Sequence, residues 1–251
     1  MTPLVTAALF IFIIGTSLLS GIFGMAGGLL LVGVLLLLLP VPEAMMLHGI
    51  TQMASNGWRA LVWWRYVSVP IAAAYAIGCL VALVAWSLTR YVPDKAIVLL
   101  FLGLTPFLVR MIPARLQPDP GKFSHGVFYG TCCMMLMLVS GVAGPLLDSF
   151  FLGGKLDRRQ IIATKGLCQI FGHGLKLVYF GAVIDNVGDV DPAIAGLAIV
   201  AAMIGTVLGR KVLEAMSDQQ YRQWAGGLIT VIGVYYIAYG LYMMVEPRLL
   251  S

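Results

Sequence analysis

The chain has 251 residues, of which 60% are hydrophobic and only 11% are charged, with a formal net charge of +5. Globular domains carry roughly 25% charged residues, so this composition excludes a soluble enzyme, a disordered chain and a disulfide-rich secreted domain. About 20 apolar residues cross a bilayer as one helix, and the length therefore accommodates roughly eight to ten crossing or half-crossing segments. The composition predicts an all-α polytopic membrane protein.

The basic balance does not predict a nucleic-acid partner, because the 16 Lys and Arg residues are scattered singly along the chain. The four cysteines lie in apolar stretches, and their spacing matches neither a zinc site nor a redox pair. We therefore expect buried thiols, no bound metal and no cofactor.

Apolar stretches follow one another along most of the chain, and several are too short to cross a bilayer alone. They cover residues 4–19, 29–39, 44–64, 70–88, 96–111, 126–139, 145–152, 161–180, 193–208 and 224–245.

Glycine and proline interrupt these stretches at residues 20–28 and 140–145, where helices are expected to break and re-enter. Close helix packing is the alternative explanation for glycine in a membrane protein. Packing and a break are equally open at Gly27 and Gly28, whereas Gly144 before Pro145 favours a break. The candidate helix-break positions are Gly24, Gly27, Gly28, Gly141 and Gly144.

An internal repeat divides the chain into two related halves, residues 1–112 and 123–251, joined by a cytoplasmic linker at 113–122. Residues 20–24 match residues 140–144 at an offset of 120, and residues 48–59 match residues 165–176 at an offset of 117. If each glycine-rich segment folds as a helical hairpin, each half has five passes and the halves are inverted copies. An even number of passes would make them parallel copies instead.

Orientation is predicted by the loop charges. The loops around 110–122, 155–159 and 210–211 are basic, whereas the loop at 185–191 contains three aspartates and neither Lys nor Arg. The basic loops are expected to face the cytoplasm.

Each half contains a helix with a polar stripe. Positions 0, 4, 7 and 11 of a helix lie within about 60° of one another, so these residues share a face. A polar stripe facing lipid would be unfavourable, and both stripes are therefore expected to face protein or a water-filled cavity. The stripes are His48, Gln52, Ser55 and Arg59 with Asn56 at the edge, and Lys165, Gln169, Gly172 and Lys176 with His173 at the edge.

The stripes are cationic, which favours an anionic substrate bound near the bilayer midplane at the repeat interface. Half-helix N-termini after Gly28 and Gly144 would add N–H donors and positive dipole ends. Alternatively, Lys165 only neutralises Asp148 while the other polar groups bridge helices, and Arg59 and Lys176 extend to the headgroups. Asp148 is the candidate for a coupling proton, with a structural salt bridge equally open. The predicted substrate-binding residues are His48, Gln52, Ser55, Asn56, Arg59, Lys165, Gln169, His173 and Lys176.

These duplicated features resemble the TauE/SafE family of sulfite exporters over nearly the whole chain. The resemblance rests on the glycine-rich turns at 21–28 and 141–144, each followed by a proline or glycine loop and a polar helix beginning at Ala44 or Ala163. It implies a multi-pass secondary transporter of the cytoplasmic membrane that moves sulfite, organosulfonates or related anions. The sequence departs from the family pattern at Pro145–Asp148 and at Lys165.

The overall prediction is a secondary anion transporter that works by alternating access, with no catalytic residues. The partners expected are a small inorganic or organic anion, the lipid bilayer, H⁺ as a candidate coupling ion, and a possible oligomeric partner. One alternative is an intramembrane enzyme that uses His48 and His173 as bases or metal ligands. The other is a membrane assembly factor, against which the short loops argue.

Overall fold

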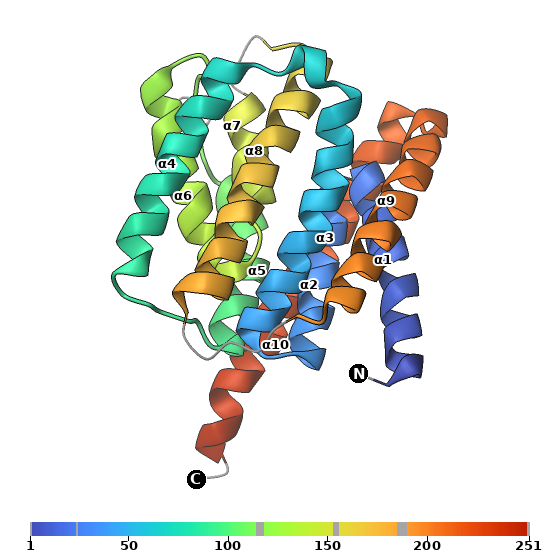
Figure 1. Cartoon of the computed structure of the whole chain (residues 1–251), viewed down its shortest axis with the longest axis vertical. Coiled ribbons are helices and arrows are strands. Elements are labelled where there is room, and N and C mark those ends of the chain that lie inside the picture. Colours follow the sequence, from blue (N-terminus) through green and yellow to red (C-terminus); the bar gives the residue numbers. More distant parts are fainter. Residues whose placement is uncertain (1, 24, 114–117, 153–155, 185–189, 250–251) are drawn as a thin grey trace.

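The computed structural model describes residues 2–23, 25–113, 118–152, 156–184 and 190–249, and its regular elements are helices (Figure 1). In chain order they are α1 (Pro3–Phe23), α2 (Ala26–Leu38), α3 (Val41–Val62), η1 (Trp64–Tyr66), α4 (Val69–Ser87), α5 (Lys95–Arg110), α6 (Phe123–Ser140), α7 (Gly144–Leu152), α8 (Arg158–Val178), η3 (Tyr179–Val183), α9 (Pro192–Ala215) and α10 (Asp218–Leu249). The predicted all-α fold is confirmed.

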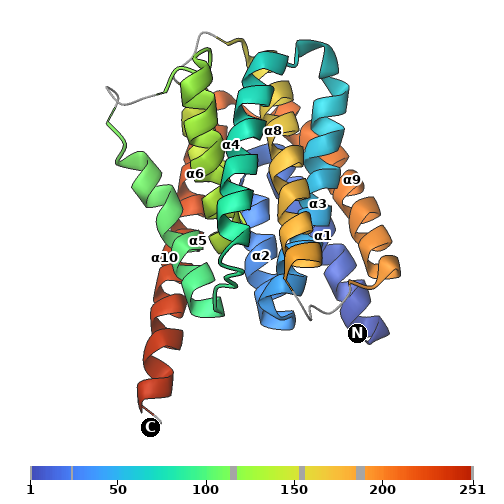
Figure 2. The ribbon, with the colours of Figure 1, turned by 60° about the vertical axis from the view of Figure 1, so that its left-hand side comes forward.

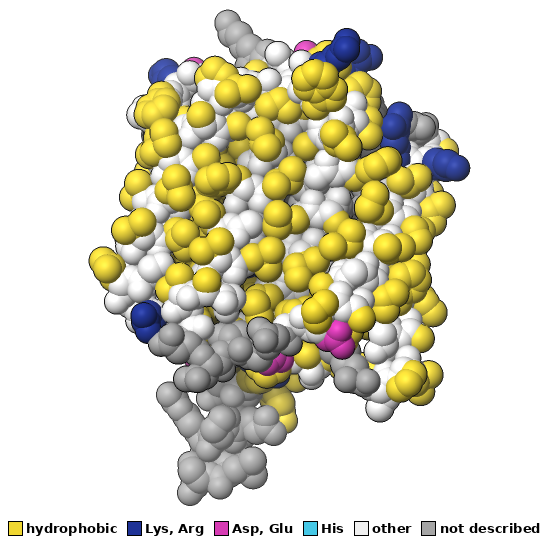
Figure 3. All heavy atoms as spheres, viewed as in Figure 1, with side chains coloured by type: hydrophobic (Ala, Val, Ile, Leu, Met, Phe, Trp, Pro, Cys, Tyr) yellow, Lys and Arg dark blue, Asp and Glu magenta, His cyan; other side chains and the backbone are white. Residues whose placement is uncertain are grey.

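Within the described ranges, five helices are long and apolar enough to cross a bilayer: α1, α4, α6, Pro192–Val212 of α9 and Gly226–Val245 of α10. Figure 3 shows hydrophobic side chains over the middle of the molecule and most of the visible Lys and Arg toward the upper end. An apolar band between charged ends is what a bilayer requires. The predicted multi-pass membrane protein is confirmed.

The two ends of the bundle differ in charge. Arg159 donates a hydrogen bond of 2.9 Å to the Tyr66 hydroxyl, so the start of α8 and η1 lie together at one end. We call this the basic end. Glu43 at the start of α3 and Asp191 just before α9 lie at the opposite end, which also carries Lys95. That the basic end faces the cytoplasm, as the positive-inside rule predicts, stays a prediction.

Helices α3 and α8 lie at the centre of the bundle (Figures 1 and 2). They have 22 and 21 residues, enough to cross a bilayer, but their polar stripes keep them out of the strongly apolar set. They pack against each other, and α2, α4 and α9 also contact one or both of them. The polar stripes of these two helices are therefore covered by neighbouring helices, while apolar residues such as Leu61 and Val178 on their outer faces are exposed.

The principal helix contacts link the two predicted halves. Helix α1 packs on α9 and α4 packs on α6, while α3 packs on α8 and α5 packs on α10. If α1 to α5 correspond in order to α6 to α10, then the α1–α9 contact corresponds to the α6–α4 contact. This pattern is consistent with a two-fold relation between the halves, which remains a prediction.

The short helices α2 and α7 do not cross the bundle. Helix α1 runs inward from the end where the N-terminus lies and α2 returns to that end, whereas α6 and α7 enter from and return to the basic end (Figures 1 and 2). The two helical hairpins thus open to opposite ends of the bundle. At 13 and 9 residues, α2 and α7 each span only part of a bilayer.

Candidate functional site

The two helix breaks meet in the middle of the bundle. Helix α1 ends at Phe23 and α2 begins at Ala26, whereas α6 ends at Ser140 and α7 begins at Gly144. A Cβ atom built on Gly144 would lie 2.8 Å from the Cβ of Met25, so the first residues of α2 and α7 are in contact. The first N–H groups of a helix have no intrahelical partner and carry its positive dipole end. Both half-helices therefore direct N–H donors toward the same region.

Backbone geometry explains the end of α6, and close packing explains the glycine in the first turn of α2. Gly141 has a φ of 80°, which glycine adopts readily, and its N–H closes α6 with a 2.9 Å hydrogen bond to the Met137 carbonyl. Gly27 lies in the first turn of α2, where a Cβ would overlap the Thr16 carbonyl oxygen and the Ser20 hydroxyl of α1. The prediction for Gly24 falls outside the described residues.

The stripe on α3 is directed into the protein. His48, Ser55 and Asn56 are almost completely buried, Gln52 is buried, and Arg59 is half-buried. On α8, Gly172, His173 and Lys176 are buried, while Lys165 and Gln169 are half-buried. The expectation that neither stripe faces lipid therefore agrees with the structure.

At the end opposite to the basic end, Lys176 and His48 form a buried pair. The Lys176 Nζ lies 2.9 Å from the His48 Nδ1 and donates a 3.2 Å hydrogen bond to the Gly141 carbonyl. The His48 Nε2 lies 3.1 Å from the Gly28 carbonyl oxygen. The His173 ring stands edge-on to His48, with ring centroids 5.5 Å apart. We call Lys176 and His48 the buried dyad.

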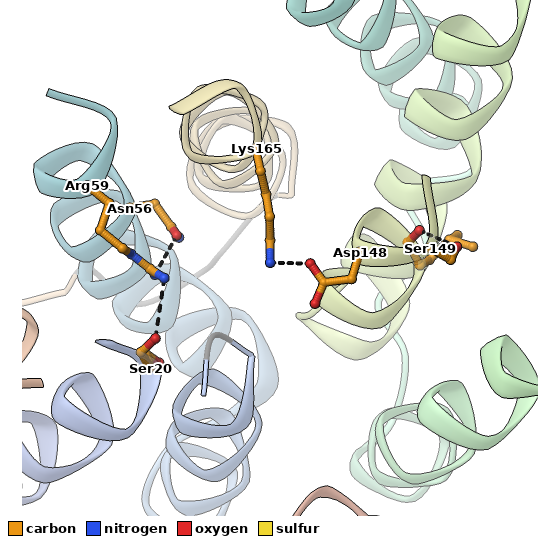
Figure 4. Close-up of polar contacts among 7 residues, drawn as sticks. Ser20, Asn56, Arg59, Asp148, Ser149 and Lys165 are labelled. Carbon is orange, nitrogen blue, oxygen red and sulfur yellow. Dashed lines mark hydrogen bonds and ion pairs between the residues drawn. The ribbon is translucent and has the colours of Figure 1, made fainter. Parts of the chain in front are cut away.

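Closer to the basic end, Lys165 of α8 forms an ion pair with Asp148 of α7 (Figure 4). Their side chains are 17% and 32% exposed, whereas the buried dyad is completely enclosed. The contact between Lys165 and Asp148 was one of the two arrangements expected from the sequence.

Arg59 of α3 points toward α1 (Figure 4). It donates hydrogen bonds of 3.3 Å to the Ser20 carbonyl and 2.7 Å to the Asn56 side-chain oxygen. The Asn56 Nδ2 and the Ser20 hydroxyl are buried, and neither has a hydrogen-bond partner within the described part of the chain. Buried donors without partners are uncommon and call for an explanation, such as a bound ligand or water. Arg59, Asn56 and Ser20 thus form a cluster of donors.

Two other predicted residues have different surroundings. The Ser55 hydroxyl lies 2.8 Å from the Thr206 hydroxyl of α9, where it links two helices. Gln52 lies beside Gly28, whose added Cβ would be 3.4 Å from the Gln52 side-chain nitrogen. Gln52 therefore reaches the start of α2, whereas Ser55 is occupied elsewhere.

Comparison with known proteins agrees with this architecture. Residues 7–236 match the family described as Sulfite exporter TauE/SafE. The chain belongs to the TauE/SafE family. No solved structure matches it significantly.

A curated protein of Malonomonas rubra, named "Carboxybiotin decarboxylase", is 31% identical to this chain over 159 residues. The alignment covers 54% of this chain and 40% of that protein. The chain thus matches well under half of the relative's length.

The departures of this TauE/SafE member from the family pattern lie together. Lys165 contacts Asp148, and Asp148 lies in the short helix that begins at Gly144 and Pro145. Lys165 and Asp148 thus neutralise each other near the basic end.

Sequence reasoning did not assign roles to Ser20, Thr206 or the carbonyls of Gly28 and Gly141. Ser20 and Gly141 both belong to the repeated Ser-Gly anchors at 20–21 and 140–141, so the repeat itself was a signal for them. Thr206 carried no such signal, because its role depends on the contact between α9 and α3.

A cavity of about 470 Å³ lies elsewhere, between α2, α5 and α10. Its lining is apolar apart from tyrosines and Lys95, and it includes none of the stripe residues. A small, strongly hydrated anion requires convergent polar donors, which this lining lacks. We therefore place the functional site between the two breaks.

Proposed function

We propose that the chain is a secondary transporter of small sulfur-containing or organic anions, such as sulfite or organosulfonates, across the cytoplasmic membrane. The observation that carries this proposal is the meeting of the N-termini of α2 and α7 beside the cationic side chains of α3 and α8. Helix N-termini and cations at a midplane break favour an anion. Membership of the TauE/SafE family supports the same substrate class.

In this proposal, the anion enters from the basic end, where Lys165 is partly exposed. The buried donors of Ser20 and Asn56 are available to bind its oxygens, and Arg59 positions Asn56 through a 2.7 Å hydrogen bond. Gln52 and Gln169 line the path along α3 and α8. His48, His173 and Lys176 lie beyond it and close the opposite end, while Ser55 holds α3 against α9.

Transport requires the site to open alternately to the two ends. The structure has a half-exposed cation near one end and a buried cation near the other, as a conformer open to the basic end would. We propose that residues 1–112 and 123–251 are inverted repeats, with Gln52 corresponding to Gln169 and Arg59 to Lys176. Exchanging the conformations of two inverted halves would open the opposite end.

The test is anion flux into proteoliposomes that contain the purified chain. We expect counterflow of radiolabelled sulfite to exceed that in protein-free liposomes. Unlabelled sulfite and organosulfonates should compete with the labelled sulfite. Potassium or choline salts of inert anions should not compete. Gly15→Val, whose added Cβ meets nothing within 4 Å, is the matched variant that should keep wild-type flux. Absence of flux for every sulfur-containing and carboxylate anion tested would contradict the proposal.

A second candidate function follows from the relative's name. A chain 31% identical to part of a protein named "Carboxybiotin decarboxylase" is a candidate for decarboxylation of a bound carboxylate, with His48 or His173 near the reacting group. Release of CO₂ from N-carboxybiotin by the purified chain would support this function. Sulfite flux without CO₂ release would favour the transporter.

A further inference from the structure

The hydrogen bonds of the buried dyad define where its protons are. A carbonyl oxygen only accepts hydrogen bonds, so the His48 nitrogen that lies 3.1 Å from the Gly28 carbonyl carries a hydrogen atom. In the neutral ring the other nitrogen, Nδ1, then has a lone pair. That lone pair faces the Lys176 Nζ at 2.9 Å, and Lys176 is the donor.

The surroundings limit the charge of the dyad. Both side chains are 0% exposed, and across the described ranges no carboxylate lies within ion-pair distance of Lys176. Two full positive charges 2.9 Å apart would repel each other strongly in such a site. The dyad therefore holds either no extra proton or one, shared between an amine and an imidazole.

The neutral state matches the contacts observed. A neutral amine has two N–H donors, and Lys176 has two acceptors, the His48 Nδ1 and the Gly141 carbonyl. An ammonium would have a third N–H without a partner among the described residues. Gaining a proton thus creates both a charge and a free donor.

The groups that face the dyad come from each neighbouring element. Helices α2 and α6 contribute the backbone carbonyls of Gly28 and Gly141, and α8 also contributes His173. His173, whose ring centroid lies 5.5 Å from that of His48, is a further titratable group beside the dyad, and its Nδ1 is buried without a partner among the described residues. Asp148 is paired with Lys165 nearer the basic end.

We propose that Lys176 and His48 together form the binding site for a coupling proton. This inference rests on the proposed function and replaces Asp148 as the proton carrier. In the step, the lone pair of the Lys176 amine takes one H⁺ from a hydronium ion, whose O–H bond breaks to leave water, and the resulting ammonium still donates to the His48 Nδ1. No other bond changes. Release to the opposite side restores the neutral pair.

The dyad is placed to link the proton to the anion. Its two carbonyl partners belong to α2 and to the end of α6, the elements that border the two breaks. A positive charge there stabilises an anion held at the breaks, and by reciprocity the bound anion stabilises the proton. Anion and proton are therefore expected to move in the same direction.

The first measurement is the number of protons taken up when sulfite binds to the full-length protein in detergent. Calorimetry in two buffers of different ionisation enthalpy, repeated from about pH 6 to about pH 9, gives this number at each pH. Free sulfite also exchanges a proton with the buffer in this pH range. That contribution is the same for every variant, so Lys176→Gln and His48→Gln serve as references. His125→Gln, which removes a histidine at the start of α6, is the matched control.

We expect the wild type and His125→Gln to take up as much as about one proton more per sulfite than Lys176→Gln or His48→Gln at the most responsive pH. Equal uptake by wild type and dyad variants at every pH would overturn the proposal and return Asp148 as the candidate. If neither dyad variant folds, the wild-type flux measurement below decides the matter alone.

The second measurement uses wild-type proteoliposomes with equal sulfite concentrations on both sides and a pH gradient. Accumulation on the alkaline side, beyond that in protein-free liposomes, supports proton coupling when it is seen both for labelled sulfite and for a labelled organosulfonate, whose sulfonate group has no proton to exchange in this pH range. Sulfite counterflow that does not depend on the pH gradient overturns the proposed proton site but leaves the proposed transport function intact. Absence of both counterflow and driven flux overturns the transport function, and this inference with it.

Discussion

The two ends of the α3–α8 pair use their cations differently. Near the basic end, Lys165 is paired with the carboxylate of Asp148, and both are partly exposed. Near the other end, Lys176 is fully buried and its partners are a neutral ring nitrogen and a carbonyl oxygen. A charged pair tolerates water, whereas a lysine sealed from water without a carboxylate favours the uncharged form.

This difference has a functional meaning in the proposed cycle. His48 and Arg59 are 11 residues apart on α3, which places them about 16 Å apart along the helix axis. One pair of helices thus connects a partly exposed ion pair with a sealed dyad, and the carbonyl partners of the dyad, Gly28 and Gly141, lie beside the two breaks. We interpret the open end as the entry for the anion and the sealed end as the closed gate.

The largest expected effect is on the hairpin that separates the two ends. Gly27→Val places side-chain atoms where the Thr16 carbonyl and the Ser20 hydroxyl of α1 already lie. Overpacking of a rigid core costs typically about 1–3 kcal/mol, and a backbone clash costs more. We expect little monodisperse protein in size-exclusion chromatography and no flux.

Gly15→Val is the control for this prediction, because a Cβ at Gly15 meets nothing within 4 Å. This variant should purify and transport like the wild type. A normal elution profile and normal flux for Gly27→Val would mean that α1 and α2 are not as closely packed as the structure shows.

The second prediction concerns the half-exposed ion pair. Asp148→Asn leaves Lys165 without its partner, and Lys165→Met leaves the carboxylate alone; we expect each to lower sulfite flux about tenfold or more, equivalent to about 1.4 kcal/mol. If the pair is structural, the double variant should recover flux. If Lys165 binds the anion, the double variant should be as inactive as Lys165→Met.

Initial rates of labelled sulfite counterflow and thermal melting of the same preparations separate these outcomes. Wild-type flux in Lys165→Met would show that the lysine has neither role.

The third prediction tests the exposure difference directly. Single cysteines at positions 148 and 165 should react with a membrane-impermeant thiol reagent added on the cytoplasmic side. Cysteines at positions 48 and 176 should react at least about tenfold more slowly, because labelling them requires opening of the closed end. Mass spectrometry of the labelled protein gives the rates.

With the partly exposed Cys132 replaced by serine in every preparation, the buried native Cys79, Cys133 and Cys168 provide an internal reference for slow labelling. Similar rates at all four introduced positions would show that the two ends are equally accessible. Added sulfite should slow labelling at position 165 if the anion binds beside it.

The smallest effect on flux is expected for Ser55, which belongs to the polar stripe of α3 but lies outside the proposed anion path. Ser55→Ala and Thr206→Val each remove one member of the hydrogen bond between α3 and α9. Such bonds between membrane helices contribute about 0.6 kcal/mol on average, so the melting temperature should fall slightly and sulfite flux should change less than about twofold. A large loss of flux in Ser55→Ala with unchanged melting would return Ser55 to the anion site.

The sequence alone determined the features that depend on local physics. Its apolar content required a membrane protein, and the spacing of His48, Gln52, Ser55 and Arg59 required a polar face on one helix. The break before Gly144 was favoured because proline follows it, whereas close packing and a break were equally open at Gly27 and Gly28, where the structure shows tight packing on α1. The apolar content, the polar face and the break before Gly144 are set by neighbours in the chain.

The tertiary structure alone decided which polar groups meet. Lys176 and His48 are 128 positions apart in the sequence, and Ser55 and Thr206 are 151 apart. No periodicity within one helix indicates that one stripe lysine is sealed against a histidine while the other pairs with a carboxylate near water. Burial and charge pairing depend on how α3 and α8 pack on each other and on the two half-helices, and that packing is a property of the whole bundle.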